Sequence, residues 1–118
     1  MSSHVQVIIH KGHKILFADC SGLKPAEIVA EINGSTQVMI AQKINLLCND
    51  ISNTTSDDSI KRAAAESVAK VTAANGKIHS SIVGLRGIQK ILANAIVRDT
   101  HFASSKEDAL DWLVKQVS

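Results

Sequence analysis

The last forty or so residues constrain the fold most, because strand-like and helix-like segments alternate there within a short length of chain. Ile78 to Val83 is a β-like run, and a turn with Gly84 and Gly87 follows it. The apolar residues after this turn recur at helical spacing: Ile88, Ile91, Leu92, Ala95 and Ile96. A brief strand is predicted at 101–103. This order of elements is half of an α/β domain.

A final helix is predicted after that strand. Ser104 and Glu107 have the spacing of a capping box, in which a hydroxyl and a carboxylate satisfy the first backbone N–H groups of a helix. The side chains expected to face inward are Ala109, Trp112, Leu113 and Val117.

The first forty residues predict a hairpin and a helix. His4 to His10 has a period of two, Lys11-Gly12 is a tight-turn pair, and His13 to Cys20 is a second β run. Pro25 suits the first turn of a helix, where a missing N–H costs nothing. We expect one helix reaching about Gln42. An earlier end at Asn33-Gly34 is the alternative.

The middle of the chain continues the alternation. Ile44 to Asp50 is a short apolar strand, and a polar loop over 52–56 follows it. Asp57 and Asp58 suit the first turn of a helix, where the dipole favours negative charge. Asn75-Gly76 is a stop signal for that helix.

These elements together predict one α/β domain over residues 1–118, with a mixed, mostly parallel sheet, an N-terminal hairpin and about four helices. The net charge of +2 gives no reason to expect a nucleic-acid partner. No apolar run approaches a membrane span and no leader pattern is present, so membrane contact is not expected and a cytoplasmic location is. Cys20 and Cys48 are expected to be small buried residues, with a disulfide or a reactive thiol as alternatives.

The chain resembles the small STAS-like proteins of bacteria, called SpoIIAA-like after an anti-sigma factor antagonist. The resemblance rests on three segments: Asp19-Cys-Ser-Gly-Leu-Lys-Pro25, Ser81-Ile-Val-Gly-Leu-Arg-Gly87 with the helix after it, and Glu107-Asp-Ala-Leu-Asp-Trp-Leu113. The element order fits over nearly the whole chain. The resemblance implies a STAS/SpoIIAA-like fold and a non-enzymatic regulatory module that binds a protein partner. A homodimer remains open.

In the wider STAS family a serine in an Asp-Ser-Ser-Gly-Leu run, after the third strand, is phosphorylated and breaks partner binding. That run is replaced here by the segment from Asp50 to Ser59, so no single residue carries the role over. The resemblance therefore implies a partner-binding or phosphorylation loop with several candidate hydroxyls: Ser52, Thr54, Thr55, Ser56 and Ser59.

The alternative function is binding of a small ligand, either an anion or nucleotide or a lipid. A strand-to-helix turn can direct backbone N–H groups at an anion. The candidate residues are Gly84, Arg86, Gly87 and Lys90. The same glycines also suit a plain tight turn.

We expect no enzyme, metal or cofactor. The five histidines show no metal-ligand spacing and are expected on the surface. Carboxylates, a thiol and a hydroxyl lie at the strand ends, but no histidine is tied to them by local spacing. These residues are Asp19, Cys20, Ser21 and Asp50. Ser21 is expected to satisfy backbone groups at the turn into the first helix.

Overall fold

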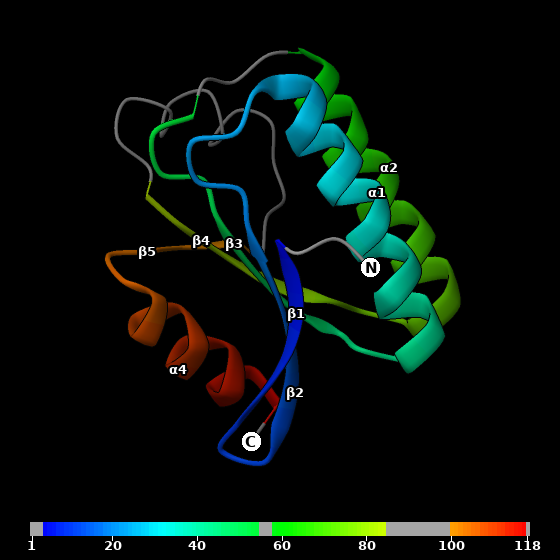
Figure 1. The fold of residues 1–118 in the computed structure, drawn as a ribbon. Helices are drawn as coiled ribbons and strands as arrows, with labels where there is room; N and C mark the ends of the chain where they lie inside the picture. Colours follow the sequence, from blue (N-terminus) through cyan, green and yellow to red (C-terminus); the bar gives the residue numbers. More distant parts are fainter. Residues whose placement is uncertain (1–3, 55–57, 85–99, 118) are drawn as a thin grey trace.

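A five-stranded sheet between two helical layers forms the described part of the chain, in a computed structural model that describes residues 4–54, 58–84 and 100–117 (Figure 1). The elements are β1 (Val5–His10), β2 (His13–Asp19), α1 (Pro25–Gln42), β3 (Leu46–Asp50), α2 (Asp58–Asn75), β4 (His79–Val83), β5 (Thr100–Ala103) and α4 (Lys106–Val117). The predicted α/β class is confirmed. Three helices lie in the described residues, and the helix predicted over 88–96 lies outside them.

The strands lie in the sheet in chain order, from β1 to β5. β1 is antiparallel to β2, and each later pair is parallel. α1 and α2 cover one face and α4 covers the other (Figure 1). The predicted hairpin and the mostly parallel mixed sheet are therefore confirmed.

The β1–β2 hairpin closes through a two-residue turn at Lys11 and Gly12. Both have positive φ angles, 51° and 85°, which is the conformation of the turns that match strand twist. His10 and His13 are the last paired residues, as the period-two pattern predicted.

α1 is one continuous helix from Pro25 to Gln42, so the alternative end at Asn33-Gly34 is wrong. Buried residues lie on both sides of this dipeptide, with Ile28 before it and Met39 after it. Burial of this face outweighs the cost of one helical glycine, about 1 kcal/mol.

Two asparagines join the C-terminal ends of α1 and α2. The Asn75 side chain donates hydrogen bonds to the carbonyls of Met39 and Ile44, at 2.9 and 3.3 Å. The Asn45 side chain donates to the carbonyls of Asn75 and Lys77, at 3.0 and 2.9 Å. α2 ends at Asn75 as predicted, because Gly76 adopts a left-handed φ of 84° and its N–H donates to a carbonyl one turn back.

β2 is buried on both faces and divides the core in two. Ile15 and Phe17 point to α4, and Leu16 and Ala18 point to the layer of α1 and α2. A strand buried on both faces has a continuous apolar run, which is the pattern of residues 15–18.

Two predicted details of α4 are wrong. The Asp108 N–H donates to the Ser105 hydroxyl at 3.1 Å, and the Asp108 carboxylate accepts the Ser104 N–H at 3.1 Å. The cap is thus one residue later than the predicted pair of Ser104 and Glu107, because the helix begins at Lys106. Val117 is 42% exposed, since the buried stripe consists of Ala109, Leu110, Leu113 and Val114.

The hairpin turn is fastened to α4 by one carboxylate. Asp111 Oδ1 lies 2.7 Å from His10 Nε2 and 3.1 Å from Lys11 Nζ. These two contacts, with the His10 hydrogen bond the larger, hold the pKa of Asp111 below its usual range. No helix in the described ranges is long and apolar enough to cross a membrane.

We predict that Asp111→Asn lowers the melting temperature at pH 7 but not at pH 2. A carboxylate with a lowered folded-state pKa stabilises above its unfolded pKa of about 3.9, and this contribution is lost as the pH falls through the folded value. Thermal unfolding followed by circular dichroism measures this. Glu66→Gln, which removes an exposed carboxylate from α2, is the control. An equal deficit at both pH values would contradict the prediction.

Candidate functional site

Two turns of the same kind lie side by side at the carboxyl ends of β2 and β3. Asp19 and Asp50 are register partners in the parallel ladder and are the last residues of their strands. In each turn the carboxylate accepts two hydrogen bonds from the serine two residues later. The N–H and Oγ of Ser21 lie 3.1 and 2.6 Å from Asp19 Oδ1, and those of Ser52 lie 3.0 and 2.7 Å from Asp50 Oδ1.

Backbone hydrogen bonds continue the sheet into these turns. The Cys20 N–H donates to the Asp50 carbonyl at 2.8 Å, and the Gly22 N–H donates to the Ser52 carbonyl at 2.9 Å. The Ile51 N–H donates to the Val83 carbonyl at 3.0 Å. The two serines are therefore held at defined positions on the sheet edge where open α/β domains bind their ligands.

Ser52 also meets the end of β4. A Cβ atom on Gly84 would overlap Ser52 Oγ and lie 2.7 Å from the Ser52 backbone nitrogen. Gly84 has a φ of 90°, which a side chain would strain as well. The close approach of Ser52 and the positive φ therefore explain this glycine without a ligand. Ser52 belongs to the predicted partner-binding or phosphorylation loop, and Gly84 belongs to the predicted anion-binding turn. The two predicted sites therefore meet through Ser52 and Gly84.

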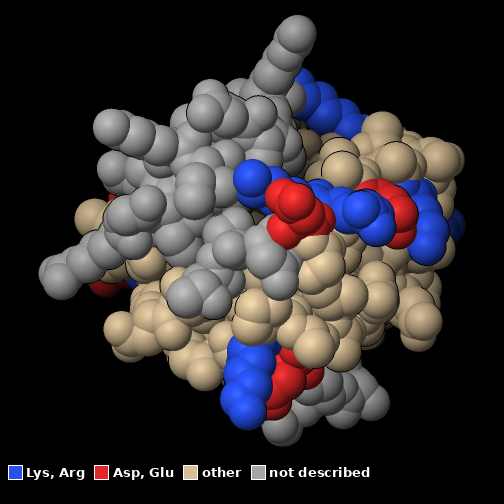
Figure 2. All heavy atoms as spheres, turned by 90° about the horizontal axis from the view of Figure 1, so that it is seen from above, with Lys and Arg blue, Asp and Glu red and all other residues tan. Residues whose placement is uncertain are grey.

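Asp19 and Asp50 bring two carboxylates to this edge of the sheet. The hydrogen bond from the Ser21 hydroxyl holds the pKa of Asp19 below its usual range, with smaller contributions from the Ser21 N–H, His4 and Lys106. The Lys106 ammonium lies 4.1 Å from the centre of the Phe17 ring. Figure 2 looks down on this edge, and on its described part acidic and basic side chains are interspersed. Two adjacent carboxylates disfavour an anion beside Ser52.

The structure describes only part of the predicted partner-binding or phosphorylation loop. The Thr54 hydroxyl donates to the Ile51 carbonyl at 2.6 Å, so Ser52 and Thr54 both make hydrogen bonds inside the turn. Ser59 is exposed in the first turn of α2. Thr55 and Ser56 lie outside the described residues.

The predicted anion site is described only at Gly84. Arg86, Gly87 and Lys90 lie outside the described residues, so ligand binding there stays a prediction.

Sequence reasoning missed the pairing of the two turns. The sequence places Asp19, Ser21 and Asp50 at strand ends but does not show that each aspartate accepts a hydrogen bond from the serine two residues later. The available signal was the repeat of Asp-x-Ser at the ends of two β-like runs, Asp19-Cys-Ser21 and Asp50-Ile-Ser52. An Asp two residues before a Ser favours such a turn, and parallel strands end at the same edge.

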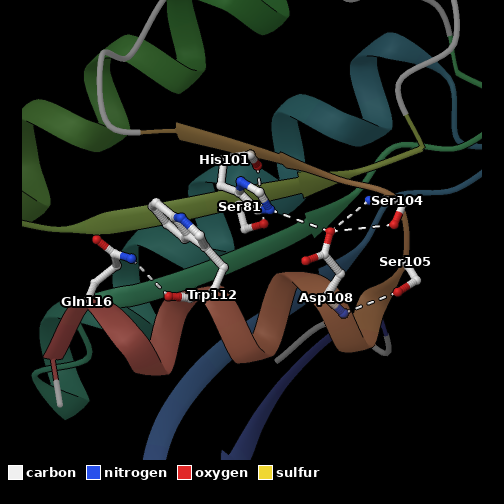
Figure 3. A network of polar contacts seen from close by, with 7 residues as sticks. All are labelled: Ser81, His101, Ser104, Ser105, Asp108, Trp112 and Gln116. Carbon is white, nitrogen blue, oxygen red and sulfur yellow. Dashed lines mark hydrogen bonds and ion pairs between the residues drawn. The ribbon is translucent and has the colours of Figure 1, made fainter.

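A second polar cluster lies under α4 (Figure 3). The rings of His101 and Trp112 stack with centroids 4.9 Å apart, and His101 Nε2 lies 3.5 Å from Asp108 Oδ2. Ser81 is fully buried, and its hydroxyl donates to the His101 carbonyl at 3.2 Å instead of to the imidazole. Ser81, His101 and Asp108 thus form structural contacts that link β4, β5 and α4.

The histidines and cysteines are part of the structural framework. All five histidines are partly exposed, and His10 and His101 also lie within 2.7 and 3.5 Å of Asp111 and Asp108. Cys20 and Cys48 are free and buried, as predicted, and the disulfide alternative is wrong. Burial raises the pKa of each thiol to about 12. Within the described ranges, no group of three His, Cys, Asp or Glu side chains could hold a metal ion.

No family model matches the chain, and no curated protein matches it.

We predict that Gly84→Ala destabilises the fold by about 2–4 kcal/mol, because it adds both backbone strain and a clash with Ser52. Gly76→Ala is the matched control. Gly76 has a similar φ of 84° but open space around the added Cβ, so its cost is the strain alone, about 1–2 kcal/mol. Urea unfolding measures both. Equal costs would contradict the close approach of Ser52 and Gly84.

We predict that neither thiol of the native protein reacts with a disulfide reagent such as DTNB at pH 8. The thiolate is the reactive form, and burial keeps both thiols protonated. Two thiols per chain should react in denaturant. Rapid labelling of one thiol in the native state would show that it is accessible.

Proposed function

We propose that this chain is a STAS-like, non-enzymatic regulatory module of the bacterial cytoplasm that binds a protein partner. The proposed surface is the turn from Asp50 to Thr54 together with the exposed start of α2 at Asp58 and Ser59. The element order over the described residues is compatible with the family resemblance.

The observation that carries this proposal is the form of the turn after β3. Asp50 is followed by Ser52, and Asn53 adopts a left-handed φ of 58°, a conformation that favours glycine. The family run has Asp, then a serine two residues later, then glycine. Ser52 therefore suits the role of the family's serine better than Thr54 or Ser59. The sequence alone does not point to Ser52, because Asn53 stands where the family run has glycine.

Phosphorylation of Ser52 would act through local electrostatics. The Ser52 hydroxyl donates to Asp50 at 2.7 Å and is packed against Gly84. A phosphate there removes the donated hydrogen and places about two negative charges beside a carboxylate. The turn would have to open, and the surface formed with the start of α2 would change.

Binding rather than catalysis is proposed because the hydroxyls at this edge act as donors to carboxylates. Ser21 and Ser52 each donate to the aspartate that precedes them by two residues. A carboxylate whose pKa is held below its usual range, as that of Asp19 is, is a weak base for activating a serine. The paired turns are suited to a fixed, polar recognition surface.

We predict that Ser52→Asp, which places a fixed charge in the turn, lowers partner capture at least tenfold. Ser52→Ala, which removes the hydroxyl without adding charge, should retain capture. The measurement is quantitative mass spectrometry of proteins retained from a bacterial lysate by the immobilised chain. Thr72→Asp adds the same charge at an exposed position near the other end of α2 and is the control.

Circular dichroism should show that all three variants are folded. Retention of the same proteins by wild type and Ser52→Asp would overturn the proposed surface.

A further inference from the structure

β1 is an edge strand without the features that usually protect such edges. Its six residues, Val5 to His10, include no proline, lysine, arginine, aspartate or glutamate. Within residues 4–54, 58–84 and 100–117, no strand pairs with its outer side. Ile9 is 70% exposed, the largest exposure among the large hydrophobic residues described. Proteins usually protect edges with charge, proline or a bulge, so this strand is open to pairing.

The hydrogen-bonding pattern of the hairpin determines which backbone N–H and C=O groups of β1 face outward. The Asp19 N–H donates to the His4 carbonyl at 2.8 Å, so His4 and Asp19 form a hydrogen-bonded pair. In an antiparallel ladder such pairs alternate along the strand. Residues 4, 6, 8 and 10 therefore direct their backbone groups to β2, and Val5, Val7 and Ile9 direct theirs outward.

We propose that the chain forms a homodimer in which β1 pairs antiparallel with β1 of a second copy, centred on Val7. This register places Val7 opposite Val7 of the second copy and Ile9 opposite Val5 of the second copy. It pairs the outward N–H and C=O groups of all three residues. Any shift of register leaves some of these groups without a partner within β1.

The side chains support the same register. Val7 lies beside Leu16 in the ladder and packs against the core under α1 and α2. Pairing at Val7 continues this apolar row across the two-fold axis, because the side chains of paired residues share one face of the sheet. The exposed Ile9 gains a neighbour in Val5 of the second copy.

Charge favours a second copy as the occupant. The paired segments are uncharged, so no like charges are brought opposite each other within them. Outside them, antiparallel pairing places the hairpin tip of one copy, with Lys11, near the strand end of the other copy that neighbours Asp19. Lys11 and Asp19 carry opposite charges. The interface is independent of the surface proposed for the protein partner.

The first test is sedimentation velocity of the full chain at concentrations from about 5 to 500 µM. The proposal expects a concentration-dependent dimer for wild type. Ile9→Lys should weaken association at least tenfold, because the charge lies within the paired row. Ile40→Lys is the matched control, since Ile40 is a 37% exposed isoleucine on α1. A wild-type monomer at every concentration would overturn the proposal, and so would a dimer unaffected by Ile9→Lys.

The second test reads the register by oxidative crosslinking of introduced cysteines. Val7→Cys places two thiols on residues whose Cα atoms are about 5.5 Å apart in a hydrogen-bonded pair, within the range for a disulfide. Ile9→Cys places them about 14 Å apart, given the rise of a β-strand. The native Cys20 and Cys48 are buried and do not compete.

Val7→Cys should therefore give a covalent dimer on non-reducing electrophoresis, and Ile9→Cys should not. Crosslinking through Ile9→Cys alone, or through neither, would overturn the proposed register. Circular dichroism of both variants separates a failed crosslink from a failed fold.

Discussion

The parallel pairing of β2 with β3 is the contact on which the rest of the structure depends. It places Asp19 opposite Asp50, so both strands end at the same level and both chains turn there. β2 is buried on both faces, and its side chains reach both halves of the core. A slip of one residue would turn every side chain of β2 to the opposite face. That exchange would move Phe17 from the α4 side to the α1–α2 side, where Leu16 and Ala18 now pack.

The register of this pair also determines the chemistry of the sheet edge. Each turn ends its strand by folding a serine back onto an aspartate, and the Gly22 N–H joins one turn to the other. Ser52 then lies so close to the end of β4 that only glycine fits at position 84. The edge consequently has two carboxylates that each accept a hydrogen bond from a serine hydroxyl. A change of charge at Ser52 would therefore affect contacts at the ends of β2, β3 and β4.

Much of the fold could be predicted from local signals, and most of the site could not. Pro25, the Asn75-Gly76 pair and the period-two hairpin are local, and each predicted boundary is confirmed within one or two residues. The cap of α4 was misplaced because Ser104 and Ser105 are both competent caps and only the start of the helix decides between them. The contact of Ser52 with Gly84 depends on strand order and register, which single-sequence patterns do not specify. The stacking of His101 on Trp112 likewise joins β5 to α4.

Symmetry keeps the two proposed surfaces apart. A two-fold axis through Val7, perpendicular to the sheet, keeps α1 and α2 of both copies on one face but reverses the direction of the strands. The carboxyl ends of the two copies then point in opposite directions, so each turn at Ser52 remains open while the dimer forms. Each copy in the dimer could then bind its own partner. If the dimer forms as proposed, β1 variants should therefore change the assembly and leave the affinity of each Ser52 surface unchanged.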